Sequence, residues 1–485
     1  MASAIEGLEP KLVWKYFAEL ARIPRGSGNE AAVSKWVQGT AKRLGLKVKA
    51  DALGNVAVQK PASPGKERVK RICLQGHLDM VCEKNKDVKH DFLKDPVELV
   101  RKGNLLMANG TTLGADNGIA VATNLAIMED TSLVHGPLEF LFTVDEETGL
   151  TGAAGLASDF LESRTLMNLD SEEEGALYVG CSGGRDTTGA WDPGFEPSPA
   201  GAVAGELRVA GLKGGHSGLE IDKGRGNAIK ILNRSLLLLA EHGARLSSIE
   251  GGNKRNAIPR EAEALVFVPK QSWDAAVAAV KALEATAKAE VATVDPGLTV
   301  TLAPKAGAKK GKVVKRAVQT KLCRTISALP HGVTKMSADI PGLVETSTNV
   351  AVITTEKRKI SLATSQRSSV ASEIHEICHT VKAIFEMGGA DVKQGDGYPG
   401  WKPNLASPIL KVAKSTYKQL YGKEPEIKAI HAGLECGIIG KRAPGMDMVS
   451  FGPTLEGVHS PDEKIHIDTV PKFWDFLLGI LKNVN

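Results

Sequence analysis

The sequence predicts an α/β fold, with a mixed, mostly parallel sheet covered by helices on both faces and a second, α+β domain inserted into it. The length of 485 residues suits two domains better than one core. Helical and strand-like patterns alternate over the first ~190 residues, which is the rhythm of βαβ units. Segments rich in Pro and Gly at 191–201 and 394–403 then interrupt this pattern and mark domain boundaries.

The first part of the chain supplies the elements of the parallel sheet in alternating order. Helical apolar spacing predicts helices at 13–21, 30–44 and 118–128. Strand-like runs lie at 53–59, 69–78, 138–144 and 165–169. The run 138–144 is apolar almost throughout, as expected for a central strand with both faces buried.

After residue 190 the order of strands and long amphipathic helices is typical of an α+β domain with one antiparallel sheet. The expected helices are at 227–238, 273–291 and 369–386. Beyond residue 396, helices at 407–421 and 472–481 flank short strands. We expect this last part to rejoin the first domain, so that residues 1–190 and 397–485 enclose an inserted domain of residues 191–396.

Composition and charge argue against several function classes. The net charge of +5 is spread over a long chain, and its basic excess at 84–102 and 305–316 is expected in solvated loops or helix faces. No aromatic-interleaved basic stripe is present, so we expect no nucleic-acid partner. No apolar run approaches the roughly 20 residues that span a bilayer, and the N-terminus lacks a signal-peptide pattern. Six scattered cysteines fit reduced, buried thiols. We therefore expect a cytoplasmic protein with no membrane partner.

Acids and histidines follow several of the strand-like runs. His77 and Asp79 stand in Gln-Gly-His-Leu-Asp, where His77 could bind a metal ion while Asp79 orients its ring. A buried His bonded to its neighbour is the structural alternative. Asp116 lies between two glycines, ahead of an apolar helix. It could be an N-cap or a carboxylate that bridges two cations.

Three adjacent acids, Asp145, Glu146 and Glu147, follow the apolar strand. Their mutual repulsion is costly without a cation nearby, and strands of an α/β sheet end in the ligand crevice. One of Glu146 and Glu147 could bind a metal ion while the other acts as general base. Asp170 follows another strand, and His459 lies in a Gly/Pro loop, where an ordinary loop His would look the same.

Together these residues supply two histidines and three or four carboxylates. Two zinc ions about 3.5–4 Å apart, bridged by one carboxylate and one water, would use this inventory, whereas calcium would not need the histidines. Other catalytic patterns are weaker: Cys181 fits a turn position, and Ser217 does not match a nucleophile elbow. Neither a P-loop nor a dinucleotide-binding fingerprint is present.

The chain resembles the cocatalytic zinc exopeptidases, the family that includes carnosinases, aminoacylases, succinyl-diaminopimelate desuccinylase and related carboxypeptidases. The resemblance extends along nearly the whole chain and is closest to the bacterial-type aminoacyl-histidine dipeptidases (Xaa-His dipeptidase, peptidase D). It implies that residues 1–190 and 397–485 form the catalytic domain and residues 191–396 a lid and dimerisation domain. The motifs that carry it are GHLDMV, LGADNGI, DEETGL, NLDSEEEG, GLKGGHSG, HAGLECG and HSPDE.

The resemblance also implies a set of metal ligands. One Zn²⁺ would be bound by His77 and Asp170, and the other by Glu147 and His459. Asp116 would bridge the two ions. Mn²⁺ or Co²⁺ could replace Zn²⁺, because first-row divalent ions compete for such sites.

Catalytic roles follow from the same resemblance. Glu146 would take a proton from a water that bridges the two cations, as this water attacks the peptide carbonyl, and would pass it to the leaving amine. Asp79 would orient His77. His216 of GGHSG matches a lid histidine that stabilises the oxyanion and is often delivered from the other subunit, so a homodimer is expected.

Both ends of a short substrate have implied partners. Arg367 matches a lid arginine that clamps the C-terminal carboxylate of the peptide. Glu435 in HAGLECG matches the position that receives the free α-amino group. Asn256 and Asn349 are further implied contacts.

We therefore expect a homodimeric dizinc dipeptidase that acts on Xaa-His and other unblocked dipeptides, including carnosine-like ones. An N-acyl amino acid amidohydrolase would use the same metal site, but its substrate would leave Glu435 without an amine to bind. A catalytically silent relative would lack a ligand or the base, and all five ligands and Glu146 are present.

Overall fold

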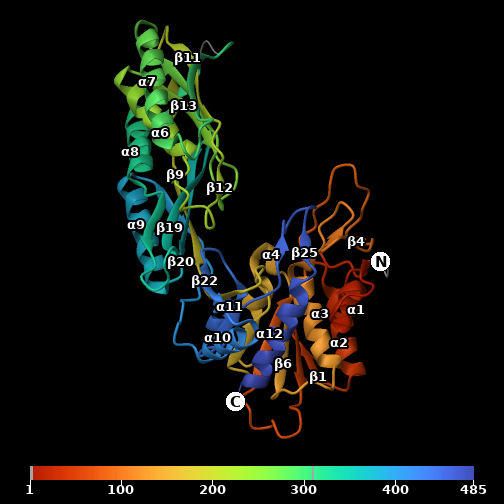
Figure 1. Cartoon of the computed structure of the whole chain (residues 1–485). Helices are drawn as coiled ribbons and strands as arrows, with labels where there is room; N and C mark the ends of the chain where they lie inside the picture. Colours follow the sequence, from red (N-terminus) through yellow and green to blue (C-terminus); the bar gives the residue numbers. More distant parts are fainter. Residues whose placement is uncertain (1–3, 308–310, 485) are drawn as a thin grey trace. The chain divides into compact units, whose positions relative to one another are not determined.

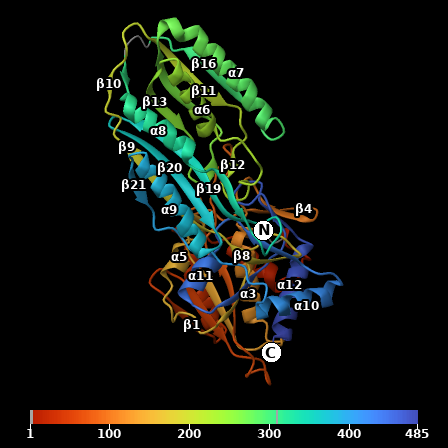
Figure 2. The same cartoon turned by 90° about the vertical axis from the view of Figure 1, so that its left-hand side faces the viewer.

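The structure is a computed structural model that describes residues 4–307 and 311–484. In this part of the chain two compact units form (Figures 1 and 2). The first unit contains the chain up to Gly180, Pro403–Ala429 and the chain from Leu434 on, and the second contains Cys181–Lys402 and Ile430–Gly433. The sequence-based division had its boundaries after residues 190 and 396. Residues 308–310 of the basic segment 305–316 lie outside the described residues.

The first unit is built, within the described residues, on an eight-stranded sheet. Its strands from edge to edge are β1 (Lys47–Ala50), β2 (Val56–Lys60), β6 (Leu138–Thr143), β3 (Ile72–His77), β7 (Thr165–Asn168), β23 (Asp447–Ser450), β8 (Ala176–Cys181) and β22 (Glu426–Ile430). The central strands β6, β3, β7 and β23 are parallel. The pairs β1–β2, β2–β6 and β23–β8 are antiparallel. The C-terminal segment thus contributes β23 to the sheet begun by the N-terminal part.

Helices cover both faces of this sheet, as two neighbours on β3 illustrate. Successive side chains of a strand point to opposite faces. A Cβ atom on Gly76 would lie 2.4 Å from Asn117 Oδ1 and 2.8 Å from Ala120 Cβ, so α3 (Ala115–Glu129) lies directly against that face. Gln75 donates to Glu435 at 2.6 Å, so α11 (Glu435–Arg442) lies on the other face. The predicted α/β fold is confirmed.

The remaining helices of the first unit pack in two groups. α1 (Lys11–Leu20) and α2 (Ala31–Arg43) pack with α3, whereas α10 (Pro408–Tyr421) contacts β23 and α12 (Thr469–Asn483). Two short helices, α4 (Glu146–Gly149) and α5 (Thr151–Gly155), follow β6. A small sheet adds β24 (Leu455–Glu456), β25 (Lys464–His466), β5 (Leu105–Ala108) and β4 (Leu99–Lys102) in that order.

One predicted strand is shorter than the sequence pattern suggests. The run 53–59 becomes β2, which starts only at residue 56. The reason is the Asp51 carboxylate, which accepts hydrogen bonds at 3.0 Å from the backbone N–H groups of Leu53, Gly54 and Asn55. A turn held by such bonds competes with strand pairing.

The second unit is an α+β structure built on one large antiparallel sheet, as predicted, with two small two-stranded sheets in addition. In the described residues the strand order is β16 (Thr299–Pro304), β11 (Val203–Ala210), β15 (Ala262–Val268), β13 (Arg245–Gly251), β19 (Val344–Glu356), β20 (Lys359–Ser368), β9 (Gly183–Trp191) and β21 (Asp391–Gln394), with β18 (Gly332–Met336) also on β19. Four helices pack on it: α6 (Ala228–Glu241), α7 (Trp273–Val291), α8 (Arg316–Ala328) and α9 (Ala371–Met387) (Figure 1). The alternate residues Ala262, Ala264, Val266 and Val268 all enter the core shared with these helices, so the helices lie on one face. Across residues 4–307 and 311–484, no helix combines the length and apolar character needed to cross a membrane.

Candidate metal centre

Five side chains predicted as metal ligands come from five segments of the first unit and meet at the carboxyl ends of its parallel strands. His77 is the last residue of β3, Glu147 follows β6, and Asp170 follows β7. These strands are parallel, so their carboxyl ends lie at the same edge, where α/β sheets bind ligands. Asp116 starts α3, and His459 lies between β24 and β25.

The five side chains form two triads that share Asp116. In one triad, His77 Nε2 lies 3.0 Å from Asp116 Oδ1 and 3.4 Å from Asp170 Oδ1. In the other, His459 Nε2 lies 3.2 Å from Asp116 Oδ2 and 2.9 Å from Glu147 Oε2. Each oxygen of Asp116 thus faces a different histidine. This is the geometry of a carboxylate that bridges two neighbouring cations.

Asp79 connects the first histidine to the loop that follows β6. Its carboxylate lies 3.2 Å from His77 Nδ1 and accepts the backbone N–H groups of Glu146 and Glu147, both at 3.1 Å. Ser27 donates to it as well, at 2.8 Å. A carboxylate beside Nδ1 holds a proton on that nitrogen, so that Nε2, which faces Asp116 and Asp170, would be the nitrogen that binds a cation.

The centre places several carboxylates close together and away from water, which is unfavourable unless cations or protons neutralise them. Burial raises the pKa of Asp170 to about 7. Burial also raises the pKa of Glu146 well above its usual value, and the charge of Asp170 adds to this effect although His77 opposes it. Hydrogen bonds with Asp116 and Glu147 raise the pKa of His459 to about 11. Burial thus favours protonated Asp170 and Glu146, and the neighbouring carboxylates favour protonated His459, when only the protein is present.

The residues present fit two divalent cations. Glu147 Oε1 is buried and has no hydrogen-bond partner among the described residues, which is unusual for a carboxylate oxygen. Each triad offers one imidazole nitrogen and one unshared carboxylate, in addition to Asp116. Nitrogen and oxygen ligands of this kind, with positions left open, are typical of catalytic zinc and similar first-row ions.

Two features of the centre were not predicted from the sequence. Asn117 accepts the N–H of His77 at 3.2 Å and donates to Leu169 O at 2.9 Å, so it joins two of the ligand loops. Asp145 and His459 have φ values of 52° and 61°, a left-handed conformation that is uncommon for residues other than glycine and often found at functional sites. An Asn directly after a bridging acid is the signal that could have indicated the first feature.

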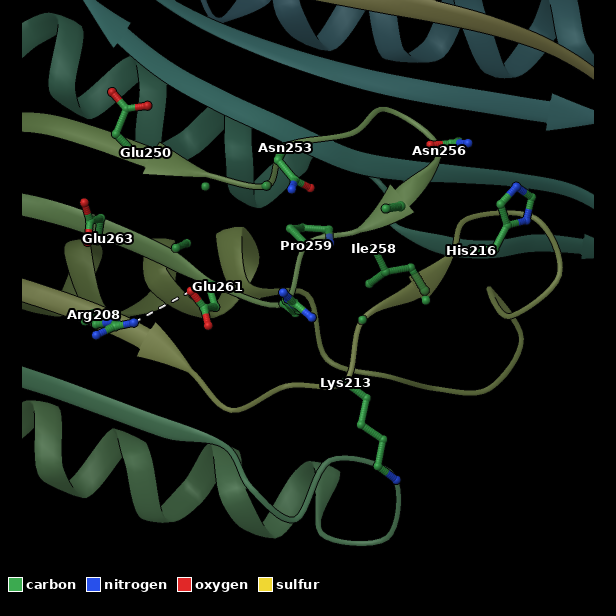
Figure 3. Close-up of a pocket in the computed structure, with 17 residues that line it drawn as sticks. Arg208, Lys213, His216, Glu250, Asn253, Asn256, Ile258, Pro259, Glu261 and Glu263 are labelled. Atoms are coloured by element: carbon green, nitrogen blue, oxygen red, sulfur yellow. Dashed lines mark ion pairs between the residues drawn. The ribbon is translucent and has the colours of Figure 1, made fainter. Parts of the chain in front are cut away.

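His216 and Asn256 lie together in the second unit, where β12 (Gly215–His216) pairs with β14 (Ala257–Ile258). The Ser217 N–H donates to Asn256 O at 2.8 Å. Both residues line an open cavity of about 650 Å³. Figure 3 shows them at the same end of this cavity, away from Arg208 and Glu263.

The backbone around His216 determines which ring nitrogen carries its proton. Nδ1 accepts the N–H groups of Gly218 (3.2 Å) and Leu219 (3.1 Å). A nitrogen that accepts cannot carry the proton, so the neutral ring carries it on Nε2. Burial lowers the pKa of His216 to about 4, and the charge of Arg367 contributes. The ring is therefore a neutral hydrogen-bond donor near pH 7.

Arg367 and Asn349 lie on the neighbouring strands β20 and β19 of the second unit. Arg367 Nη1 donates to the Tyr398 hydroxyl at 2.9 Å, and its buried Nε has no partner among the described residues. Asn349 Nδ2 donates to Ala257 O at 2.8 Å, next to Asn256. All four lid residues predicted from the sequence are thus in this unit.

Glu435 differs from the other predicted substrate contacts because it is in the first unit and fully buried. Its Oε2 accepts from Gln75 Nε2 (2.6 Å) and Thr143 Oγ1 (2.7 Å). Its Oε1 has no hydrogen-bond partner among the described residues. Burial raises the pKa of Glu435 to about 7.

Comparisons with known proteins agree with this fold. The profile of peptidase family M20/M25/M40 matches residues 73–483. Over 483 residues the chain is 41% identical to the cytosol non-specific dipeptidase of Escherichia coli (strain K12), with 99% of each protein covered. The crystal structure of aminoacylhistidine dipeptidase from Vibrio alginolyticus matches with a TM-score of 0.90 at 40% identity, covering 99% of this chain and 98% of that chain. Aminopeptidase PepT from Bacillus cereus ATCC 10987 shares the fold, with a TM-score of 0.58 at 17% identity and 98% and 99% covered.

Two ligand triads that share a carboxylate at the strand ends are typical of two-metal hydrolases. The comparisons narrow this class of enzymes to the metallopeptidases. The chain belongs to peptidase family M20/M25/M40. The expected family and the expectation of an enzyme that hydrolyses peptide bonds are confirmed. The roles of individual residues stay predictions.

We expect His216 to titrate near pH 4 and to carry its proton on Nε2 at higher pH. Its pKa in the folded protein lies below the ordinary value of about 6.5. The unfolded chain therefore binds this proton more tightly, and His216 should reduce stability as the pH falls from 6.5 towards 4. The ring signals can be followed by NMR during a pH titration and assigned with a His216→Asn variant. A midpoint near 6.5, or a proton on Nδ1, would contradict the assignment.

Proposed function

We propose that the protein is a dipeptidase that hydrolyses unblocked dipeptides, Xaa-His and carnosine-like ones among them. The observation that carries the proposal is the pair of triads that share Asp116, with Glu146 beside them. The names of two similar proteins support it: the Escherichia coli relative is a non-specific dipeptidase, and the Vibrio alginolyticus one is an aminoacylhistidine dipeptidase. The two names differ in specificity, so both histidine-containing and other dipeptides are proposed substrates.

The proposed ions are two Zn²⁺ per subunit, with Mn²⁺ or Co²⁺ as substitutes. His77 and Asp170 would hold one ion, Glu147 and His459 the other, and Asp116 both. Cations held by these residues would supply Lewis acidity, which polarises a peptide carbonyl and lowers the pKa of water at the site.

Glu146 is the proposed general base. Oxygen atoms of Glu146 and Glu147 and a ring nitrogen of His77 lie within 4.8 Å of one another, and Asp79 fixes the backbone of both glutamates. Glu146 would accept a proton from the attacking water and return it to the leaving amine. Burial raises the pKa of Glu146 above its ordinary value, the direction that favours return of the proton to the leaving amine.

The ends of the dipeptide are proposed to bind separately. Arg367 would clamp the C-terminal carboxylate through its guanidinium, with Asn256 and Asn349 as further contacts. The free α-amino group would bind Glu435, whose Oε1 lacks a partner. Charge recognition at both termini distinguishes a dipeptide from a longer chain.

His216 is the proposed oxyanion donor, because its Nε2 proton can stabilise the charge that develops on the carbonyl oxygen. Resemblance to the family supports delivery of this residue from the partner subunit of a homodimer. A cytoplasmic location is proposed because the Escherichia coli relative is named a cytosol enzyme.

Hydrolysis of a small substrate panel tests the proposed function. Gly-His, β-Ala-His, Ala-Leu, N-acetyl-His and a tripeptide would be incubated with chelator and with added Zn²⁺ or Mn²⁺. We expect cleavage of the three free dipeptides only, abolished by the chelator and restored by metal. Cleavage of N-acetyl-His alone would favour an amidohydrolase of N-acyl amino acids. Absence of cleavage with every metal would contradict an enzymatic role.

Replacement of the proposed base should separate catalysis from metal binding. We expect Glu146→Gln to lower kcat by about 10²–10⁴-fold, the usual contribution of a general base, with the bound-metal content unchanged. Glu173→Gln is the matched control, because Glu173 pairs with Lys428 at 2.7 Å instead of joining the triads. Full turnover in Glu146→Gln would rule out the assigned role.

Mixing two inactive variants tests whether His216 acts across subunits. A Glu146→Gln subunit keeps His216, and a His216→Ala subunit keeps Glu146. If His216 is delivered by the partner, a remixed 1:1 population of dimers should recover about a quarter of wild-type activity, because half the dimers contain one complete site. No recovery, despite verified exchange of subunits, would place His216 in its own subunit's site.

A further inference from the structure

The segment Leu113–Asp116, where α3 begins, is held by a distant carboxylate. Glu463 accepts two N–H groups that precede α3 and the first two of α3, which have no partner within a helix. Glu463 Oε2 accepts from the N–H groups of Leu113 (2.7 Å) and Gly114 (2.9 Å). Its Oε1 accepts from those of Ala115 (2.7 Å) and Asp116 (3.2 Å). Glu463 is only 2% exposed, so water does not compete for these four bonds.

The carbonyl side of the same segment is held by a buried cation. Arg25 Nη2 donates to Gly114 O. Its Nη1 donates to Leu78 O at 2.9 Å and to Asp79 O at 2.7 Å. One guanidinium therefore joins the loop after β3, which carries the partner of His77, to the segment that carries the shared carboxylate.

Two glycines show how closely this guanidinium is packed. A Cβ atom on Gly114 would lie 2.6 Å from Arg25 Nη2, and one on Gly118 would lie 2.7 Å from the same nitrogen. Gly114 also has a φ of +69°, which L side chains rarely adopt. Glycine at both positions thus allows the backbone to approach Arg25.

We propose that Glu463 and Arg25 are positioning residues of the metal centre: by fixing both sides of the segment before α3, they set the place of Asp116 and with it the affinity for both cations. This inference rests on the proposed function, because it requires Asp116 to be the shared ligand. Neither residue is one of the five proposed ligands, and neither is assigned a contact with substrate.

Metal binding should depend on these two residues because the orientation of the Asp116 carboxylate is critical. Its two oxygens face different histidines, so a rotation that improves one triad disturbs the other. Four charge-assisted bonds to a carboxylate are stronger than bonds between neutral groups, and they fix the orientation of the peptide groups on both sides of Gly114. An ordinary helix N-terminus, hydrated or capped by a local side chain, would leave more freedom.

The test compares Glu463→Gln with Asp462→Asn. A glutamine can accept through only one atom and would turn its NH₂ group towards two N–H donors. Asp462 is the exposed neighbour of Glu463, so its replacement removes the same charge from the same loop. Two quantities would be measured on full-length protein: the Zn²⁺ dissociation constants, by competition with a chromophoric chelator, and the Tm of metal-stripped and metal-loaded forms.

We expect Glu463→Gln to weaken Zn²⁺ binding about tenfold to hundredfold, as is usual for residues that orient ligands, and Asp462→Asn to change it less than about twofold. The rise in Tm on metal loading should shrink in Glu463→Gln, and excess metal should restore kcat. Wild-type affinity in Glu463→Gln, with an equal drop in Tm for both forms, would overturn the inference, because it would show support of the fold alone.

A second variant covers the case in which Glu463→Gln does not fold. Arg25→Lys keeps the buried charge but loses the planar fork of donors. This variant should also weaken Zn²⁺ binding, and excess metal should again restore its kcat. Unchanged affinity in a folded Arg25→Lys would contradict the inference. Failure of wild-type protein to bind two ions would overturn the proposed function itself, and this is measured before any variant is compared.

Discussion

The arrangement of the first unit depends on the cost of placing several carboxylates around Asp116. Two like charges about 4 Å apart repel by about 4 kcal/mol at the effective dielectric of a protein surface, and burial in this unit raises the pKa of Asp170 and Glu146. Cations offset this cost only if the ligands from five segments of the chain keep their relative positions. The sheet supplies part of this positioning, because His77, Glu147 and Asp170 follow parallel neighbouring strands.

The remaining positioning of the ligands comes from side chains that hydrogen-bond to the backbone of the segments that carry them. Asp79 accepts from the loop after β6, Asn117 joins the loops after β3 and β7, and Glu463 accepts from the segment before α3. Each of these hydrogen bonds fixes the backbone of a segment that carries a proposed ligand. The orientation of the backbone in turn limits where the ligand side chain can point. A ligand set built in this way is preorganised, and little conformational entropy remains to be lost when cations bind.

The sequence predicted the sheet and pointed to the proposed ligands for a physical reason, which also explains the features that it missed. Apolar runs that end in an acid or a histidine are local patterns. His77, Glu147 and Asp170 could therefore be selected as candidates without knowledge of distant parts of the chain. Glu463 could not, because its hydrogen-bond partners lie about 350 positions earlier in the chain, and a Glu in a loop is usually solvated. Likewise, no local pattern indicates that Glu435 is fully buried against Gln75. The turn at Asp51 shortens β2 because hydrogen bonds to the Asp51 side chain replace strand pairing there. The alternation of apolar and polar residues does not reveal this.

His77 and His216 are fixed in opposite tautomers by their neighbours. At His77 a carboxylate lies beside Nδ1, so Nδ1 is the donor and the Nε2 lone pair remains for a cation. At His216 two backbone N–H groups point at Nδ1, so Nδ1 is the acceptor and Nε2 carries the proton. The same side chain is therefore suited to bind a cation in one unit and to donate a hydrogen bond in the other. A carboxylate in place of the Gly218 and Leu219 N–H groups would reverse the tautomer of His216 and remove the donor that an oxyanion requires.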